Sequence, residues 1–316
     1  MLDSDIKRYK DLNTFLRKYF GERVQKISID AGFTCPNRDG TISSGGCIYC
    51  NPKGSGTGAY SRGISVREQL EAGKKRLGKR YKAKKFLAYF QSYTNTYGTV
   101  NELEKIYDEA LSVDGVCGLS VGTRPDCIDE KKIGLFENYA KNGYLIWIEY
   151  GLQSIHDKTL VKINRGHDFK CFEKAWELTR NRGLYTCVHV ILGLPGETRE
   201  DMIETAKVIS DMGIEGVKLH LLYVVKGTLL EKEFLGKNFR CLTQKEYVEI
   251  AADFIENISS EMVVHRITGD PHIDELTAPF WSLRKDETLT MINKELSIRG
   301  TSQGYSRGSK KMIFSG

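Results

Sequence analysis

The sequence predicts an α/β fold in which βα units repeat around a parallel sheet. Short β-rich runs alternate with longer helical runs, and six such units fit before residue 260. The strand runs are nearly continuously apolar (Val188, Val190, Ile191 and Leu192 in the fifth), as is typical when both faces of a sheet are covered. Several helical runs end in a glycine that leads directly into the next strand. The spacing leaves open whether the sheet is flat or curls into a partial barrel.

The individual elements follow in order along the chain. Strands are expected at Val24–Ile29, Lys85–Phe90, Gly115–Val121, Tyr144–Tyr150, Leu184–Leu192 and Gly216–Tyr223. Helices are expected near Ser65–Leu77, Val100–Leu111, Glu130–Lys141, Phe169–Arg182, Arg199–Met212 and Thr243–Ile258. Asp129, Thr198 and Thr243 stand where helix N-caps belong. Beyond Ile258 we expect one further strand, a helix near Asp286–Leu296 and a loose end.

Charge and hydropathy limit the possible partners and compartment. The 316 residues include 47 basic and 41 acidic ones, a net charge of +6, which is compatible with a polyanionic substrate. Basic residues gather between Lys74 and Lys85, either as a solvated helix end or as a contact for a polyanion. The sequence has no apolar run of about 18 residues, so no membrane span is expected. Its polar N-terminus lacks a secretory signal, which predicts a cytoplasmic protein with reduced thiols.

Three of the eight cysteines form a distinct constellation. Cys35, Cys47 and Cys50 follow the first strand in a loop rich in Gly, Asn, Asp and Ser, with the spacing Cys-x11-Cys-x2-Cys. Three thiolates suit an iron–sulfur cluster, whereas structural zinc needs a fourth ligand that does not lie nearby in the sequence. A zinc site completed from afar, or unrelated cysteines, remain alternatives. Cys127 and Cys241 are assigned no role.

Several further motifs give the cysteine loop a family context. The stretches CPNRDGTISSGGCIYC, YFQSYTNTY, GTRPDCID, EYGLQSIHDKTLVKINRGH and ILGLPGE resemble radical S-adenosylmethionine (SAM) proteins of the YhcC/YtqA-like family, which is related to the radical SAM domain of the elongator catalytic subunit. The resemblance runs from about residue 20 to the end of the chain. It implies a partial (βα)6 barrel over residues 1–258, including a cluster loop at 30–50, and a small C-terminal extension over 259–316 packed on this core. The chain ends where the elongator subunit carries an acetyltransferase domain, so acetyl-CoA chemistry is not expected.

The resemblance also assigns cofactors and candidate site residues. It implies a [4Fe–4S] cluster on Cys35, Cys47 and Cys50, and SAM whose amino and carboxylate groups chelate the open iron. Reductive cleavage then yields a 5′-deoxyadenosyl radical. The candidate SAM-binding residues are Tyr49 (adenine), Gln153 (ribose), Arg165 (carboxylate), Ser92, Thr94 and Asn95 (amino group), Thr123 and His189; the catalytic candidates are Arg124 and Glu149. A loop salt bridge for Arg165, a core role for His189 and turn formation at residues 92–95 are the structural alternatives.

The same resemblance predicts a substrate and a partner. It points to tRNA, with removal of the carboxymethyl group of 5-carboxymethylaminomethyluridine at the wobble position to leave 5-aminomethyluridine. A one-electron donor such as flavodoxin or ferredoxin is the other expected partner. Two alternatives stay open: a radical SAM enzyme acting on a porphyrinogen-like or other small acidic metabolite, and a zinc-containing RNA-binding protein without catalysis. The sequence gives no prediction of the oligomeric state.

Overall fold

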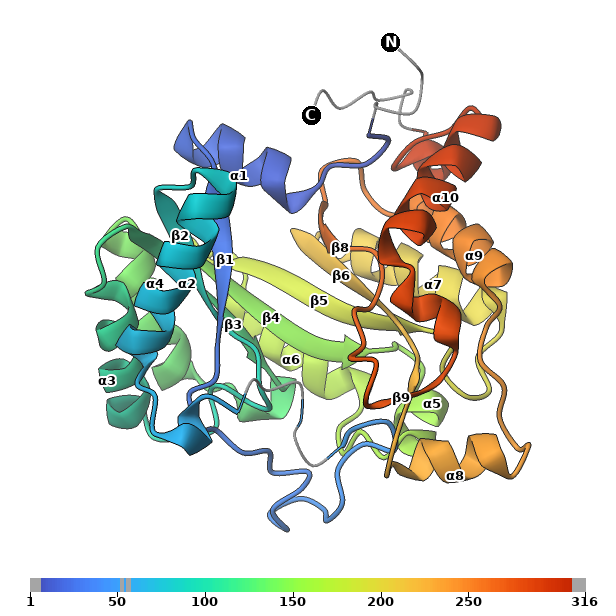
Figure 1. Ribbon diagram of the computed structural model, residues 1–316, viewed down its shortest axis with the longest axis horizontal. Helices are drawn as coiled ribbons and strands as arrows, with labels where there is room; N and C mark the ends of the chain where they lie inside the picture. Colours follow the sequence, from blue (N-terminus) through green and yellow to red (C-terminus); the bar gives the residue numbers. More distant parts are fainter. Residues whose placement is uncertain (1–6, 52–53, 55–57, 309–316) are drawn as a thin grey trace.

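Seven parallel strands form a curved sheet, a partial barrel, in the computed structural model, which describes residues 7–51, 54 and 58–308 (Figure 1). Their order across the sheet follows the chain: β1 (Val24–Ile29), β2 (Lys85–Phe90), β3 (Val116–Thr123), β4 (Leu145–Gln153), β5 (Tyr185–Leu192), β6 (Gly216–Leu221) and β8 (Val263–Arg266). A small antiparallel pair, β7 (Val224–Val225) and β9 (Leu276–Ala278), lies apart from it. The predicted α/β fold is confirmed, and the strand expected beyond residue 258 is β8, the seventh strand of the sheet.

Helices lie along the outside of this sheet (Figure 1). They are α1 (Leu12–Phe20), α2 (Val66–Tyr81), α3 (Val100–Leu111), α4 (Glu130–Lys141), α5 (Asp157–Lys162), α6 (Phe169–Thr179), α7 (Arg199–Asp211), α8 (Leu229–Leu235), α9 (Gln244–Asn257) and α10 (Lys285–Ile298). The predicted caps are confirmed, since the side chains of Asp129, Thr198 and Thr243 each accept a hydrogen bond from the backbone NH three residues on. Helices α1, α5 and α8 were not predicted. Helices α5 and α8, with six and seven residues, are too short for a clear apolar period, whereas α1 has an amphipathic pattern that the prediction overlooked.

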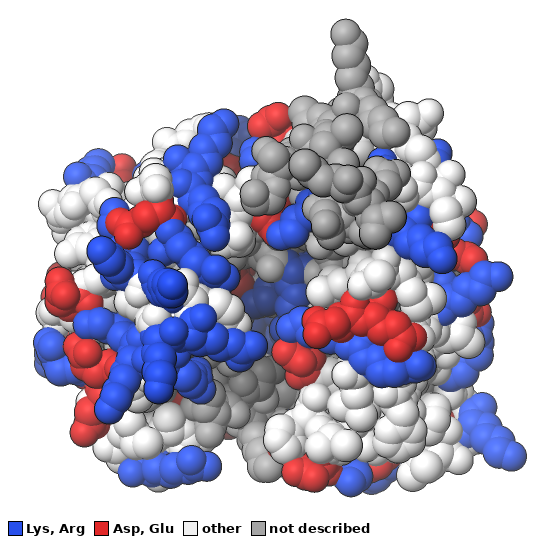
Figure 2. Space-filling view, turned by 45° about the horizontal axis from the view of Figure 1, so that its top comes forward, with Lys and Arg blue, Asp and Glu red and all other residues white. Residues whose placement is uncertain are grey.

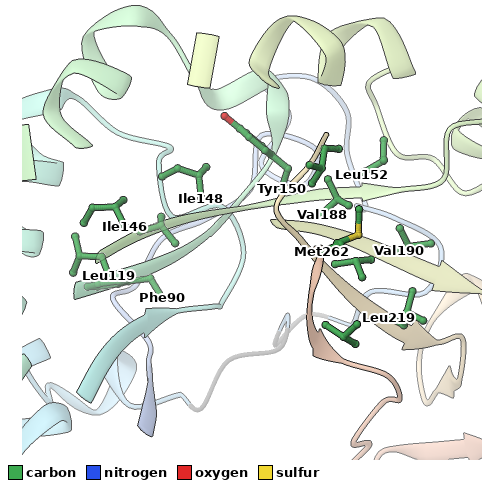
Figure 3. Packing of buried hydrophobic residues seen from close by; sticks show 14 of the residues in the cluster. Phe90, Leu119, Ile146, Ile148, Tyr150, Leu152, Val188, Val190, Leu219 and Met262 are labelled. Carbon is green, nitrogen blue, oxygen red and sulfur yellow. The ribbon is translucent and has the colours of Figure 1, made fainter. Parts of the chain in front are cut away.

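The two faces of each strand have different surroundings. Along β4, Ile146, Ile148 and Tyr150 belong to the large core between sheet and helices, where Figure 3 shows them beside side chains of neighbouring strands. Trp147 and Glu149 alternate with them and therefore face the barrel interior. The nearly continuous apolar runs predicted for the strands are thus interrupted at inward positions, which include charged residues.

An apolar layer closes the barrel interior at the amino ends of the strands. Trp147 packs there with Cys187 and with Leu16 of α1. The ring of Phe15, also on α1, meets Trp147 edge to face at a centroid distance of 5.5 Å. Helix α1 therefore acts as a plug, and the interior opens toward the carboxyl ends of the strands.

The C-terminal segment is tied into the core by one buried side chain, Gln303. Its amide nitrogen donates to the carbonyls of Ser259 (2.6 Å) and Met262 (2.7 Å), and its amide oxygen accepts from the backbone NH of Lys10 (2.8 Å). Because β8 also pairs with β6, residues on both sides of position 258 share one sheet. Residues beyond position 258 therefore supply the seventh strand of the sheet. The expected division into a core and a C-terminal extension stays a prediction.

The basic run between Lys74 and Lys85 lies on the second half of α2 and the turn into β2, at the amino ends of the strands. Figure 2 shows Lys and Arg side chains gathered on the side of the molecule where α1 and α2 lie. The cysteine loop follows the opposite end of β1, and a six-residue strand spans roughly 20 Å. In the described ranges, no helix is long and apolar enough to cross a bilayer.

Candidate active site

A cavity of about 160 Å³ at the carboxyl ends of the strands brings the three cysteines together with most of the predicted site residues. The cavity is lined by Cys35, Cys47, Cys50, Tyr49, Thr94, Thr123, Arg124, Glu149, Gln153, Arg165 and His189, among others. Ser92 and Asn95 are the two predicted residues that do not line it. This is the edge at which parallel α/β sheets place their ligands.

The cysteine loop is held in place by polar contacts from a second loop, residues 164–166. Asn37 is fully buried and donates to the carbonyl of Asn164 (2.7 Å), and Asn164 donates in return to the carbonyl of Gly46 (2.8 Å). Within the cysteine loop, Arg38 donates to the carbonyls of Cys50 (3.0 Å) and Asn51 (2.8 Å). The sequence analysis missed Asn37 and Arg38, although both stand directly behind Cys35 in the CPNR stretch.

The three thiols do not lie close enough together to form a closed zinc site. All three cysteines are free, and their sulfur atoms do not all lie within 4.8 Å of one another. Zinc–sulfur bonds of about 2.3 Å in a tetrahedron would require sulfur separations of about 3.8 Å. Burial and the neighbouring Cys47 raise the pKa of the Cys50 thiol, so a bound cation or cluster would stabilise the thiolate form of Cys50.

Arg165 supplies positive charge beside the cysteines. Its guanidinium is buried, donates to the carbonyl of Gly151 (Nε, 3.1 Å) and lies 3.6 Å from the sulfur of Cys47. Burial opposes the charged form, but Cys47 and Tyr49 nevertheless hold the pKa of Arg165 above its usual value. Arg165 is thus placed to compensate the negative charge of a thiolate-bound group.

Comparison with known proteins assigns the family. The chain matches the radical SAM superfamily over residues 35–209 and the radical SAM C-terminal domain over residues 214–297. The chain belongs to the radical SAM superfamily. This family implies a [4Fe–4S] cluster and SAM, and the three cysteines of the cavity are the residues that would hold the cluster.

Individual relatives agree with this assignment. The chain is 43% identical to YtqA of Bacillus subtilis over 298 residues (94% of this chain, 92% of YtqA) and 39% identical to YhcC of Escherichia coli K12 over 293 residues (93% of each). It is 28% identical to the tRNA uridine(34) acetyltransferase of Methanocaldococcus infernus over 160 residues, which are 48% of this chain and 29% of that protein. The solved archaeal Elp3 structure from the same organism has a similar fold, with a TM-score of 0.67 at 18% identity over 92% of this chain and 68% of that one.

Two of the predicted SAM contacts carry hydroxyl groups without a partner. The side-chain oxygens of Ser92 and Thr94 are buried, and neither has a hydrogen-bond partner within the described residues. Thr94 lines the cysteine cavity, so its unsatisfied hydroxyl suits a polar ligand group such as the SAM amine. The amide nitrogen of Asn95 donates to the carbonyl of Gly122 (2.8 Å), and its backbone carbonyl accepts from Tyr107. The buried amide oxygen of Asn95 has no partner among the described residues, but Asn95 does not line the cavity. Its expected contact with SAM stays a prediction.

Arg124 contacts the backbone of Arg165 and, within the described ranges, does not bond to the cysteines. Its guanidinium forms two hydrogen bonds with Asp126 (2.8 and 2.6 Å), and its third nitrogen donates to the carbonyl of Arg165 (2.8 Å). Arg124 therefore positions the loop that carries Arg165, and its expected contact with substrate stays a prediction. Thr123 shares a hydrogen bond of 2.6 Å with Thr96 and also lines the cavity.

Gln153 ends β4 in an uncommon backbone conformation. Its φ is 75°, in the left-handed region that residues other than glycine seldom occupy. The side chain lines both the cysteine cavity and a neighbouring cavity of about 400 Å³. A strained residue at this junction is consistent with the predicted role of Gln153 in binding SAM, because such strain is often retained at ligand sites.

Beneath the cavity lies a charged layer with Glu149 at its centre. Glu149 is fully buried and bonds with Ser120, Lys26, Lys218 (3.2 Å) and His189 (2.8 Å). Burial opposes ionisation, but the two lysines hold the pKa of Glu149 well below its usual value. Its expected catalytic role stays a prediction, since its oxygen atoms are engaged within the protein.

The lysines of this layer were not predicted. Lys26 and Lys218 stand inside strands β1 and β6, and each lies more than 60 positions from Glu149 along the chain. A lysine within a strand of a covered sheet could have predicted this layer, because a lysine that is buried needs a negatively charged or polar partner. The sequence left two roles open for His189, a core histidine or a residue of the site. In the structure His189 bonds to Glu149 and also lines the cavity, so its position is compatible with both.

The larger cavity extends from the cysteines toward the C-terminal segment. Cys50, Gln153, His189 and His220 line one side of it, and a loop with the acidic residue Asp270 lines the other. It is contiguous with the cysteine cavity through the residues that both share. A substrate placed in the larger cavity would thus adjoin a group bound at the cysteines.

Proposed function

We propose that this radical SAM enzyme acts on tRNA and removes the carboxymethyl group from 5-carboxymethylaminomethyluridine at the wobble position, leaving 5-aminomethyluridine. The observation that carries the proposal is the larger cavity, which adjoins the cysteines and presents both acidic and imidazole groups to a substrate. The similarity to a tRNA uridine(34) acetyltransferase supports the choice of a wobble uridine. The proposed substrate side chain holds an amine and a carboxylate on either side of one methylene.

The chemistry divides between the cofactors and the chain. When bound, the cluster and SAM would supply the radical chemistry that takes a hydrogen atom from the substrate, here from the glycine-like methylene. Return of one further electron to the cofactor and addition of water would then break the bond between the amine nitrogen and this methylene, so that 5-aminomethyluridine is left and the two carbons depart as glyoxylate. We propose that Arg165 and Thr94 orient SAM through its carboxylate and its amine, and their position on the wall of the cysteine cavity supports this role. Trp147 and α1 close the amino end of the barrel, which excludes water from the site on that side.

One observation favours a second candidate, a small acidic metabolite as substrate. The basic run between Lys74 and Lys85 lies at the amino ends of the strands, away from the cavity, so it does not surround the entrance that a tRNA would approach. The binding of unmodified tRNA at rising salt separates the candidates, since an RNA site loses affinity steeply with salt.

The direct test is a reaction with defined RNA. Anaerobically reconstituted protein is incubated with SAM, dithionite and tRNA that carries 5-carboxymethylaminomethyluridine, and the nucleosides are then separated and weighed by mass spectrometry. The proposal expects 5-aminomethyluridine together with 5′-deoxyadenosine, and neither product from the Cys47→Ala variant. Formation of 5′-deoxyadenosine with an unchanged wobble nucleoside would show that the substrate is a different one.

A further inference from the structure

Two histidines stand side by side on the wall of the larger cavity. His189 on β5 and His220 on β6 have ring centroids 5.1 Å apart, at an interplanar angle of 40°. Both line the cavity that also holds Cys50 and Gln153. Each ring is fixed from behind by a charged residue on another strand, and these contacts determine which nitrogen carries the proton.

His220, on the cavity wall, is held as a neutral hydrogen-bond donor. Arg266 on β8 lies with its Nη2 2.7 Å from Nδ1 of His220, and a guanidinium can only donate, so Nδ1 is the acceptor. The proton of the neutral ring is then on Nε2, which is buried and has no partner in the part of the chain that the structure describes. Burial and the charge of Arg266 lower the pKa of His220 well below its usual value, which keeps this neutral tautomer at pH 7.

His189 is held in the complementary state. Its Nε2 lies 2.8 Å from a carboxylate oxygen of Glu149, which can only accept, so Nε2 carries the proton and Nδ1 is left as an acceptor. Burial and the charge of Lys218 lower the pKa of His189 to about 4, so the ring is neutral at pH 7. The cavity wall therefore offers one acceptor and one donor on adjacent rings.

The excess positive charge lies on the side of the cavity formed by this pair. Behind the two rings, Lys26, Lys218 and Arg266 contribute three positive charges and Glu149 one negative charge, whereas the carboxylates of Asp270 and Glu275 line the same cavity away from the rings. Among the described residues, no carboxylate forms an ion pair with Arg266. A carboxylate entering the cavity next to His220 would reduce this imbalance.

From this arrangement we infer that His189 and His220 select the substrate by its amine and carboxylate. His189 accepts a hydrogen bond from the protonated secondary amine, and His220 donates one to the carboxylate one carbon away. The inference rests on the proposed function and makes the two imidazoles its specificity-determining residues. The product, 5-aminomethyluridine, lacks the carboxylate and loses the contact with His220, so it should bind more weakly than the substrate.

Two RNA probes that differ only in the carboxylate test this inference. Anticodon stem-loops with 5-carboxymethylaminomethyluridine or with 5-methylaminomethyluridine are bound to reconstituted protein with SAM but without reductant, and dissociation constants are measured. Wild-type protein should prefer the carboxylated probe. His220→Leu should weaken binding of that probe by about ten- to a hundred-fold, which is the loss expected for a hydrogen bond to a charged group, and leave the methylated probe unchanged. The Arg266→Gln variant should also prefer the carboxylated probe over the methylated probe less strongly than wild-type protein does.

The controls separate failure of the inference from failure of the proposed function. His156→Gln alters a half-buried histidine outside the cavity and should leave binding of both probes unchanged. Iron content and SAM cleavage without RNA report whether each variant is folded. If wild-type protein neither binds nor converts the carboxylated RNA, the proposed function is wrong. If it converts that RNA while His220→Leu weakens both probes equally, or neither, the inference alone is overturned.

Discussion

At the scale of single residues, Glu149 is the counter-charge for the lysines inside the barrel, and we expect the stability of the fold to depend on it. It lies on the central strand β4 and is completely buried, yet it stays ionised because lysines from β1 and β6 meet it from opposite sides. A buried ion pair adds little stability by itself, but removing one partner leaves the others unpaired in a poorly polar interior.

Glu149→Gln should therefore lower the free energy of unfolding by about 3–5 kcal/mol, because Lys26 and Lys218 would remain buried without a counter-charge. Urea denaturation followed by circular dichroism measures the change. Glu261→Gln is the matched control, since Glu261 is 78% exposed and its pair with Lys10 should be worth less than about 1 kcal/mol. Equal effects of the two substitutions would contradict a central role for Glu149.

The sequence and the structure agree best where a motif is local. Cys35, Cys47, Cys50, Gln153 and Arg165 each stand within a recognisable stretch, and the structure brings all five to one cavity. Lys218 and Arg266 were not predicted, because their partners lie on other strands and only the register of the sheet brings them together. A sequence displays spacing along one chain segment, whereas this layer is formed across six strands, β1, β3, β4, β5, β6 and β8.

At the scale of elements, the decisive contact is between the cysteine loop and the loop of residues 164–166. Gly166 has a φ of 77°, and a Cβ atom there would collide with the side chain of Asn37, which is itself buried beneath the cysteines. The length of an element decided whether it could be predicted from the sequence. The long helices were predicted with small errors at their ends, but β7 and β9, with two and three residues, carry no periodic signal.

Gly166→Ala should displace the cysteine loop and reduce the iron bound after reconstitution by several-fold, with little change in circular dichroism. Gly134→Ala is a suitable control, because Gly134 lies on the exposed face of α4 with open space around it. That substitution should stabilise the protein by up to about 1 kcal/mol through helix propensity. Full iron loading of Gly166→Ala would show that the loop contact does not position the cysteines.

At the scale of the whole molecule, neutral buried histidines make stability depend on pH. Burial lowers the pKa of His189 to about 4 and that of His265 to about 3, and an unfolded chain restores ordinary values near 6.5. Between these values the unfolded state binds more protons than the folded state. Stability is therefore present in full above about pH 6.5 and is lost progressively as the pH falls toward 4.

His265→Gln should flatten this dependence. Between pH 6 and 4, the slope of the unfolding free energy should decrease by about 1.4 kcal/mol per pH unit, since one proton-binding group is removed from the unfolded state alone. Urea denaturation at a series of pH values measures the slope. His272→Gln, at an exposed position, should leave the slope unchanged, and an identical profile for His265→Gln and wild-type protein would exclude His265 as a contributor.

The most direct test of the whole account concerns the three cysteines. Wild-type protein and the variants Cys35→Ala, Cys47→Ala, Cys50→Ala and Cys171→Ala are reconstituted anaerobically with iron and sulfide, and reduced in the presence of SAM. Bound iron, sulfide and zinc are measured together with 5′-deoxyadenosine. The account predicts about four iron and four sulfide per chain and formation of 5′-deoxyadenosine in wild-type protein and in Cys171→Ala, with both lost in the other three variants. Zinc without sulfide, or unaltered SAM cleavage after loss of Cys47, would contradict it.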